Sequence, residues 1–396
     1  NGSGSTIINS SGSLKGGVSQ TNQAIDADGL FATNSYLSKN LSINTKDVIS
    51  LDDGIVAQNY GTGFLEISVI GDVTSTSTYT SDDDNSFGIY ADGYGTDVTV
   101  STTGDVTSND RGIFAWNKGS GKTTITSTSN VTTSFGDGIY ADNADWSSGS
   151  QTTSSATDIH ITANNVTAYD YGINVHNFGT GSTTISATGI IKGGIGQADQ
   201  TWNSSGIYVW NDPTSNNLDI TAKDVSGLSE GVVAFNLGSG KTNISLIGNI
   251  TSTSTLKSDT ATSYAIYADS YGTNINVAAL GDVTSNFGGI ALTNNGSGDT
   301  NLTSTGTVTA VNGNGIDAEN GETSSASDIT INTNHVKAGS FGIIASNYGT
   351  GETVITSTGE VTASASAGIS ASNYSPSSSS DITIVAKDVE AYAEGI

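Results

Sequence analysis

Residues 172–192 read GINVHNFGTGSTTISATGIIK, and this stretch decides the fold because relatives of it recur along the whole chain. After Gly172, Ile173 and Val175 alternate with polar residues, which is the period of a strand with one buried face. The letters FGTG then place two glycines at a corner, where the backbone must bend. A second strand, STTISATG, and a short third piece centred on Ile191 follow. The stretch therefore predicts one three-sided coil of β-structure.

Copies of this coil recur at a nearly fixed interval. Most begin 24–27 residues after the previous copy, and four steps of 34 residues include loop insertions of 9–10 residues. Repeats of this length bury their apolar sides by stacking on one another. The predicted fold is all-β, a right-handed parallel β-helix (β-solenoid) of about 13 coils with three short strands each. The copies open at Gly29, Gly54, Gly88, Gly112, Gly138, Gly172, Gly206, Gly231, Ala265, Gly289, Gly315, Gly342, Gly368 and Gly395.

A longer repeat spans six coils. The copies that start at Gly29 and Gly54 match those at Gly206 and Gly231 with one offset of 177 residues. We predict superrepeats over approximately residues 29–205 and 206–394, within a single continuous solenoid over residues 1–396. Both ends of the sequence fall inside a coil, so we expect the array to be longer than this sequence.

Asparagine occupies the sixth position of most copies. Stacked coils are about 4.8 Å apart, so each side-chain amide can bond the next one and also satisfy corner backbone groups. The pattern predicts an asparagine ladder that is interrupted at Gly93 and Ser270. Its members are Asn34, Asn59, Asn117, Asn143, Asn177, Asn211, Asn236, Asn294, Asn320, Asn347 and Asn373.

The composition excludes several classes of partner. The chain has 38 Asp and Glu against 12 Lys and Arg, for a net charge of -26. This charge repels phosphate backbones, so we expect no nucleic-acid partner. Cysteine is absent, which excludes disulfides and thiolate metal sites. No run of 18 apolar residues occurs, so we expect no direct membrane insertion by this sequence.

Units of the form GIYADN, TTITST and VTS resemble the passenger regions of bacterial autotransporters. The resemblance covers essentially the whole chain. It implies an extracellular location at the bacterial cell surface and a role in adhesion or self-association. The implied partners are copies of the chain itself, cell-surface glycans, or host and neighbouring cell surfaces. The alternative is a structural shaft or filament spacer that has no lateral ligand.

The third and fifth positions of each copy, counted from the opening glycine, lie on the first strand, point outward and often carry aromatic rings. Rings in rows can stack to stiffen the coils, each cross-strand pair contributing about 0.2–1 kcal/mol. They can also form a contact strip for sugars or for a second copy of the surface. Both interpretations stay open. The candidate ligand-binding residues are Tyr90, Phe114, Trp116, Tyr140, His176, Tyr208, Trp210, Phe235 and Tyr267.

An enzyme is the rival class, because β-helix hydrolases place carboxylates on neighbouring coils. Asp92 and Asp142 are two coils apart, with Trp116 between them and no basic partner at the intervening positions. We therefore expect no catalytic residue, and a polysaccharide-degrading enzyme is the less favoured alternative.

We also expect no cofactor and no metal site. The three histidines are scattered and do not form a metal triad. The acidic cluster Asp82–Asp84 fits a solvated loop better than a Ca²⁺ site.

An ice-binding protein is a further alternative, since threonine recurs on the outer side of the second strand. These rows are broken at Glu66, His160, Asp219 and Asn243, so this alternative is also less favoured. The threonines are Thr99, Thr124, Thr126, Thr184, Thr303 and Thr356.

Overall fold

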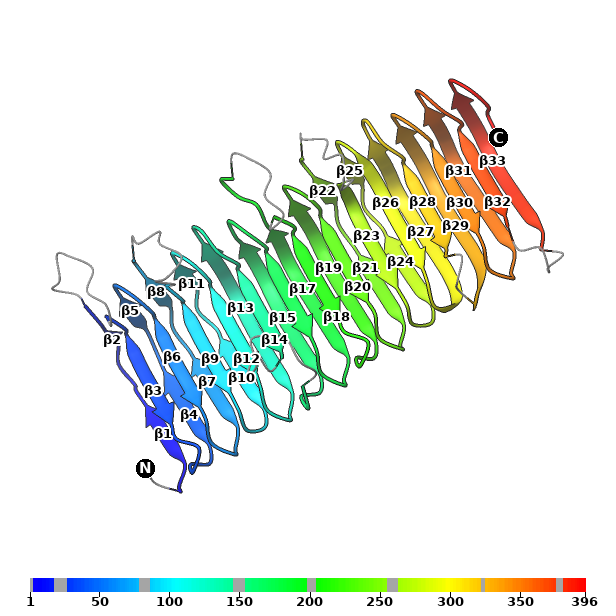
Figure 1. Cartoon of the computed structure of the whole chain (residues 1–396). Helices are drawn as coiled ribbons and strands as arrows, with labels where there is room; N and C mark the ends of the chain where they lie inside the picture. The colour runs from blue at the N-terminus through cyan, green and yellow to red at the C-terminus, as the bar shows by residue number, and fades with distance from the viewer. Residues whose placement is uncertain are drawn as a thin grey trace. The chain divides into compact units, whose positions relative to one another are not determined.

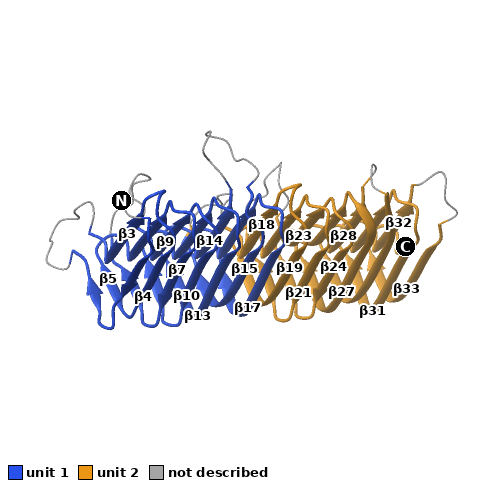
Figure 2. Ribbon diagram, turned by 90° about the horizontal axis from the view of Figure 1, so that it is seen from below, with its two compact units in different colours: residues 1–196 blue, residues 197–396 orange. Residues whose placement is uncertain are grey.

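A computed structural model gives the fold of the chain (Figure 1), which divides into two compact units (Figure 2). Unit 1 comprises Asn1–Gly196 and unit 2 comprises Gln197–Ile396. The structure describes residues 3–17, 27–77, 86–144, 154–197, 204–254, 263–321, 325–374 and 380–396. Most of the predicted loop insertions, and the acidic cluster Asp82–Asp84, lie outside these ranges.

Each unit is a parallel β-solenoid, as predicted. The strands that follow the opening glycines form the first sheet, in which successive strands pair in parallel and in register, for example Ile55 with Ile89. In unit 1 these strands are β3 (Leu30–Asn34), β6 (Ile55–Asn59), β9 (Ile89–Gly93), β12 (Ile113–Asn117), β14 (Ile139–Asn143) and β16 (Ile173–Asn177). In unit 2 they are β18 (Ile207–Asn211), β20 (Val232–Asn236), β23 (Tyr264–Ser270), β26 (Gly288–Asn294), β28 (Ile316–Asn320), β30 (Ile343–Asn347) and β32 (Ile369–Asn373).

The predicted second and third strands of each coil lie in one further sheet, the second sheet. In some coils they are separate strands, and in others they run together with a register shift, as in β13 between Ser127 and Asn130. In unit 1 the second sheet contains β1 (Thr6–Asn9), β2 (Leu14–Lys15), β4 (Leu41–Thr45), β5 (Val48–Ser50), β7 (Leu65–Val69), β8 (Val73–Ser75), β10 (Val98–Thr102), β11 (Val106–Ser108), β13 (Thr123–Thr133), β15 (Ile159–Thr167) and β17 (Thr183–Lys192). In unit 2 it contains β19 (Leu218–Gly227), β21 (Thr242–Leu246), β22 (Ile250–Ser252), β24 (Ile275–Ala279), β25 (Val283–Ser285), β27 (Ser297–Ala310), β29 (Ser325–Ala338), β31 (Thr353–Ala363) and β33 (Ile382–Ala391).

The core of each unit lies between its two sheets, and its tight dimensions explain the opening glycines. Isoleucines such as Ile113 and Ile139 are fully buried. A Cβ atom on Gly138 would lie 2.2 Å from Val166 Cγ1 and 2.7 Å from the carbonyl oxygen of Gly172. Real carbon atoms do not approach this closely, so the contact requires glycine where the third strand turns into the next first strand.

The asparagine ladder is confirmed. Asn320 Nδ2 donates to Asn347 Oδ1 at 3.0 Å. Asn347 Nδ2 donates to the carbonyl oxygens of Ser327 and Gly351, and Asn347 Oδ1 accepts the Gly349 N–H. Asn347 therefore satisfies the corner of its own coil and joins that coil to the preceding one. Threonine takes part as well, as where Thr123 Oγ1 donates to Asn143 Oδ1.

Acidic and amide side chains also form columns at the other corners. The Asp105 N–H donates to Asp72 Oδ1 at 2.9 Å, and the Asn130 N–H donates to Asp105 Oδ1 at 3.0 Å. A parallel column contains Asp97, which accepts the Lys122 N–H at 2.8 Å. Much of the acidic charge is thus structural, because these carboxylates satisfy backbone donors that the sheets leave unpaired.

Candidate functional site

The nine candidate residues all lie on the outer side of the first sheet, as predicted. Tyr90, Phe114, Trp116, Tyr140 and His176 belong to unit 1, and Tyr208, Trp210, Phe235 and Tyr267 belong to unit 2. Phe114 is only 8% exposed, and the other eight are half-buried. The rings therefore pack on each other and present part of their surface to solvent.

The rings of unit 1 form a stack along neighbouring coils. Tyr90 and Phe114 have centroids 5.2 Å apart and planes 7° apart, and Phe114 and Tyr140 are 4.8 Å and 1° apart. His176 continues the stack at 5.7 Å from Tyr140. In-register pairing of β9, β12 and β14 produces this order, because equal positions of adjacent coils lie side by side.

Arg111 closes one side of this stack, a role that the sequence analysis missed. Its guanidinium carbon lies 5.9, 5.4 and 5.6 Å from the ring centroids of Phe87, Phe114 and Tyr140. Its Nε lies 3.9 Å from Asp137 Oδ2. The cation thus packs against the side of the stack, where a ligand would otherwise contact the rings.

Lys118 covers two further rings of unit 1, those of Trp116 and Tyr94. Its Nζ lies 3.0 Å from Asp92 Oδ2, 3.5 Å from the Trp116 ring centroid and 2.8 Å from the Tyr94 hydroxyl oxygen. The Lys118 and Asp92 side chains are 9% and 3% exposed, the most buried of the ion pairs among the described residues. Asp92 therefore does have a basic partner, which comes from the corner after β12 and not from the strand positions that the sequence analysis considered.

Burial governs the protonation of the carboxyl groups in this region. Burial raises the pKa of Asp92, although Lys118 opposes the shift. Burial also raises the pKa of Asp137 to about 6, against the opposing effect of Arg111. Tyr140 donates its hydroxyl hydrogen bond to Asp142 Oδ2 at 3.0 Å, and burial raises the pKa of Tyr140. Each of these groups thus has a charged or hydrogen-bonding partner: Lys118 for Asp92, Arg111 for Asp137 and Asp142 for Tyr140.

His176 contributes as a neutral ring. Burial lowers its pKa to about 4. Its Nε2 shares a hydrogen bond of 3.0 Å with Asn174 Oδ1. At neutral pH the imidazole of His176 is therefore uncharged, and its Nε2–H donates to Asn174 Oδ1.

The rings of unit 2 form a second, looser cluster that we call the Trp210 cluster: Tyr208, Trp210, Phe235, Tyr264 and Tyr267. Phe235 lies at its centre, 5.2 Å from Trp210 and 5.5 Å from Tyr267, with planes 47° and 57° apart. Trp210, Phe235 and Tyr267 contact no Lys or Arg side chain within the described part of the chain. The two clusters therefore differ: cations cover rings of unit 1, whereas Trp210, Phe235 and Tyr267 have no such cover among the described residues.

Polar groups border the Trp210 cluster. Asp269 accepts a hydrogen bond of 2.9 Å from Asn295 Nδ2, and burial raises the pKa of Asp269. Glu230 Oε2 accepts one of 2.8 Å from Ser205 Oγ, and burial raises its pKa as well. Half-buried rings next to carboxylate and amide groups suit a ligand that has both apolar faces and hydroxyl groups.

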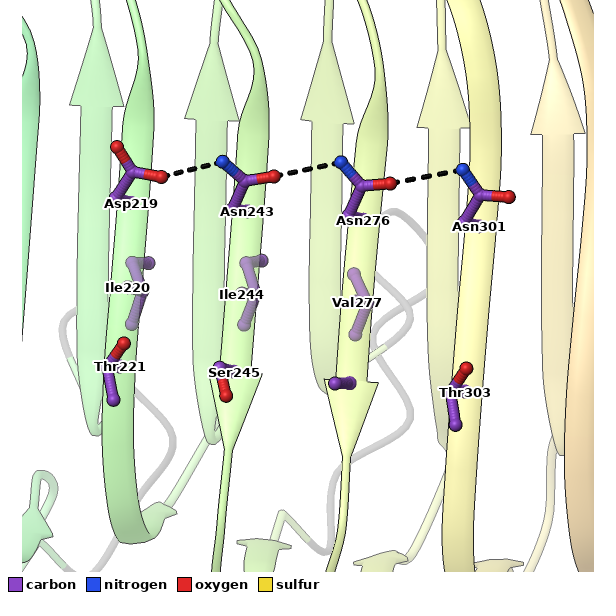
Figure 3. A pocket seen from close by; sticks show the side chains of 11 residues that line it. Asp219, Ile220, Thr221, Asn243, Ile244, Ser245, Asn276, Val277, Asn301 and Thr303 are labelled. Atoms are coloured by element: carbon purple, nitrogen blue, oxygen red, sulfur yellow. Dashed lines mark hydrogen bonds between the residues drawn. The ribbon is translucent and has the colours of Figure 1, made fainter.

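The outer side of the second sheet in unit 2 carries a groove of about 350 Å³ (Figure 3). Asn243 Nδ2 donates to Asp219 Oδ1 at 2.7 Å, and Asn276 Nδ2 donates to Asn243 Oδ1 at 2.8 Å. Asn301 Nδ2 continues the row by donating to Asn276 Oδ1 at 3.0 Å. Asp219 and Asn243, predicted from the sequence only as breaks in threonine rows, belong to this hydrogen-bonded row, in which Asp219 is the terminal acceptor.

No protein-family model, curated protein or solved structure matches the chain. Among the described residues, no group of three or more His, Asp or Glu side chains is arranged to hold a metal ion. The described segments also contain no helix long and apolar enough to cross a membrane. The assignment of function therefore depends on the geometry of the two sheets.

Proposed function

We propose that this chain is a non-catalytic adhesin of the autotransporter-passenger type, displayed outside a bacterial cell, and that its Trp210 cluster binds glycans. The observation that carries the proposal is the difference between the two ring clusters. In unit 1, Arg111 and Lys118 cover the rings. In unit 2, the rings of Trp210, Phe235 and Tyr267 are half-buried and have no such cover in the described chain.

The chemistry around the Trp210 cluster favours a sugar over other ligands. Aromatic faces pack on the C–H faces of pyranose rings, and bordering carboxylate and amide groups bind hydroxyls. Asp269, Glu230 and Asn295 supply these polar groups. The net charge of -26 disfavours polyanionic ligands, so neutral glycans are the expected class.

The test is to replace Trp210 with Ser and measure binding to an array of neutral and acidic glycans. The matched control is Trp116→Ser in unit 1, whose indole is covered by Lys118. We expect Trp210→Ser to lose binding and Trp116→Ser to retain it.

Two other outcomes would redirect the proposal. Wild-type association in analytical ultracentrifugation that Trp210→Ser abolishes, without any glycan binding, would identify a self-association surface. No binding and no association of the wild type would favour a structural shaft.

A further inference from the structure

The groove on the second sheet of unit 2 has a built row of hydrogen-bonding groups. Asn243, Asn276 and Asn301 each use one amide N–H to bond the preceding coil. Each side-chain amide has two N–H groups. Within the described chain the second N–H of each has no protein partner, so the row offers one donor per coil.

A second row beside the amides gives the groove its depth. Thr221 and Thr303 are exposed at the two ends, whereas the smaller Ser245 and Ala278 lie between them at the same register position. Between the two rows lies the strand backbone at Ile220, Ile244 and Val277, whose side chains are buried in the core. The result is a hollow floored by strand backbone, with donors along one side and hydroxyls at both ends.

The charge of the groove restricts its ligand. Asp219 is the only charged residue among those that line it, and no Lys or Arg is included. With a carboxylate as its one charged lining group, the groove repels sulfated or uronic glycans and nucleic acids. The volume of about 350 Å³ lies at the lower end of the range for small-ligand sites, about 300–1,000 Å³.

The spacing of the donors matches a repeating ligand. Successive coils are about 4.8 Å apart, which is close to the length of one hexose in an extended β-linked chain. Such a chain can place one ring on each coil, with hydroxyl oxygen atoms accepting from the amide N–H groups. Because successive β-1,4-linked rings are flipped, acetamido oxygen atoms face the row only at alternate coils. We infer that this groove binds an extended, neutral β-linked oligosaccharide along the solenoid axis of unit 2.

This site is separate from the Trp210 cluster and goes beyond the proposed function. Three of the four coils concerned also carry the Trp210 cluster, but on the first sheet: β18 leads to β19, β20 to β21, and β23 to β24. These coils therefore have one binding surface on each sheet. A chain with two such surfaces can hold two glycans at once.

The test is calorimetric titration of the full chain with cellotetraose and with chitotetraose, which distinguish hydroxyl from acetamido recognition. Ala278→Trp fills the hollow, and Thr303→Ala removes a hydroxyl from an exposed position that the core does not need. The matched control is Ser101→Trp, which places the same bulk at a half-exposed outward position of β10 in unit 1. Trp210→Ser tests independence from the first-sheet site.

We expect at least one tetrasaccharide to bind, with affinity reduced tenfold or more by Ala278→Trp and reduced measurably by Thr303→Ala. Ser101→Trp and Trp210→Ser should leave this affinity unchanged, even if Trp210→Ser abolishes binding to other glycans. No heat of binding for either ligand at millimolar concentration would overturn the inference. Equal loss in Ser101→Trp, or thermal hysteresis of ice growth that Ala278→Trp abolishes, would also overturn it.

Discussion

Lys118 Nζ lies 3.0 Å from Asp92 Oδ2 and 3.5 Å from the centroid of the Trp116 ring, so one ammonium group joins a buried carboxylate to an indole. Removing one partner of a buried pair leaves a charge without compensation and costs about 3–5 kcal/mol. Because the pKa of Asp92 is already raised, protonation of Asp92 relieves part of this cost.

We predict that Lys118→Met lowers the free energy of unfolding by about 2–4 kcal/mol, measured by urea denaturation. The control is Lys122→Met, since the pair of Lys122 with Asp158 is exposed and should contribute less than about 1 kcal/mol. Adding Asp92→Asn to Lys118→Met should restore part of the loss. Equal effects of the two lysine substitutions would contradict the importance of burial.

The opening glycines give a second prediction. Gly138→Ala would place a methyl group 2.2 Å from Val166 Cγ1, and overpacking of this kind costs about 1–3 kcal/mol. We expect a lower urea midpoint for Gly138→Ala. Gly12→Ala is the control, because nothing lies within 4 Å of its Cβ position. Similar midpoints for Gly138→Ala and the wild type would show that the coil can expand at this point.

The asparagine ladder gives a third prediction. Asn347→Leu removes the partners of Gly349, Ser327 and Gly351 in one corner, and each buried polar group left unpaired costs about 1–3 kcal/mol. We expect a loss of at least 2 kcal/mol in unfolding free energy, again scaled from those costs. Asn243→Leu, on the half-exposed outer row, should change stability by less than about 1 kcal/mol.

The acidic groups of unit 1 give a fourth prediction, which concerns pH. Burial raises the pKa of Asp53 from 3.8 to about 8, with nearby carboxyl groups adding to the effect, and raises that of Asp137 to about 6. Both bind protons more tightly in the folded state than in the unfolded chain. The free energy of unfolding should therefore fall as pH rises from about 4 to about 8.

Urea midpoints between pH 5 and pH 8 check this slope, and Asp53→Asn should reduce it above pH 6. The control is Asp105→Asn. A hydrogen bond from Ser129 lowers the pKa of Asp105, so its contribution is lost only below about pH 4. A midpoint that rises with pH in the wild type would refute the assignment.

The sequence predicted the strands and their register because their signals are local. Period-two alternation places Ile55 and Asn59 on the inner side of β6, and both are fully buried. The opening glycine and the corner glycines then fix the ends of each strand. Outward positions such as Tyr90 and Tyr140 follow from the same alternation.

The positions of Arg111 and Lys118 against the unit 1 rings could not be predicted from that alternation. Arg111 and Lys118 lie at corners, where the direction of a side chain depends on the path of the backbone and not on a period of two. One signal was present: Phe87, Arg111 and Asp137 all directly precede an opening glycine. Alignment of the repeats at that position places the three side by side.

The groove depends on side-chain size, which cannot be predicted from the alternation of polar and apolar residues. Ser245 and Ala278 are outward residues like Thr221 and Thr303, and only their smaller volume produces the hollow. The contact of cations with the unit 1 rings likewise depends on the identity of single corner residues, Arg111 and Lys118.

The corner column of Asp47, Asp72 and Asp105 makes the solenoid of unit 1 sensitive to dissolved ions. Each carboxylate accepts a backbone N–H from the next coil, so three like charges stand about one rung, 4.8 Å, apart. The Debye length is about 10 Å at 0.1 M salt, close to the span between the two outer members. Salt therefore weakens their mutual repulsion while the hydrogen bonds of 2.9–3.4 Å persist, and these coils are more stable at high salt than in dilute buffer.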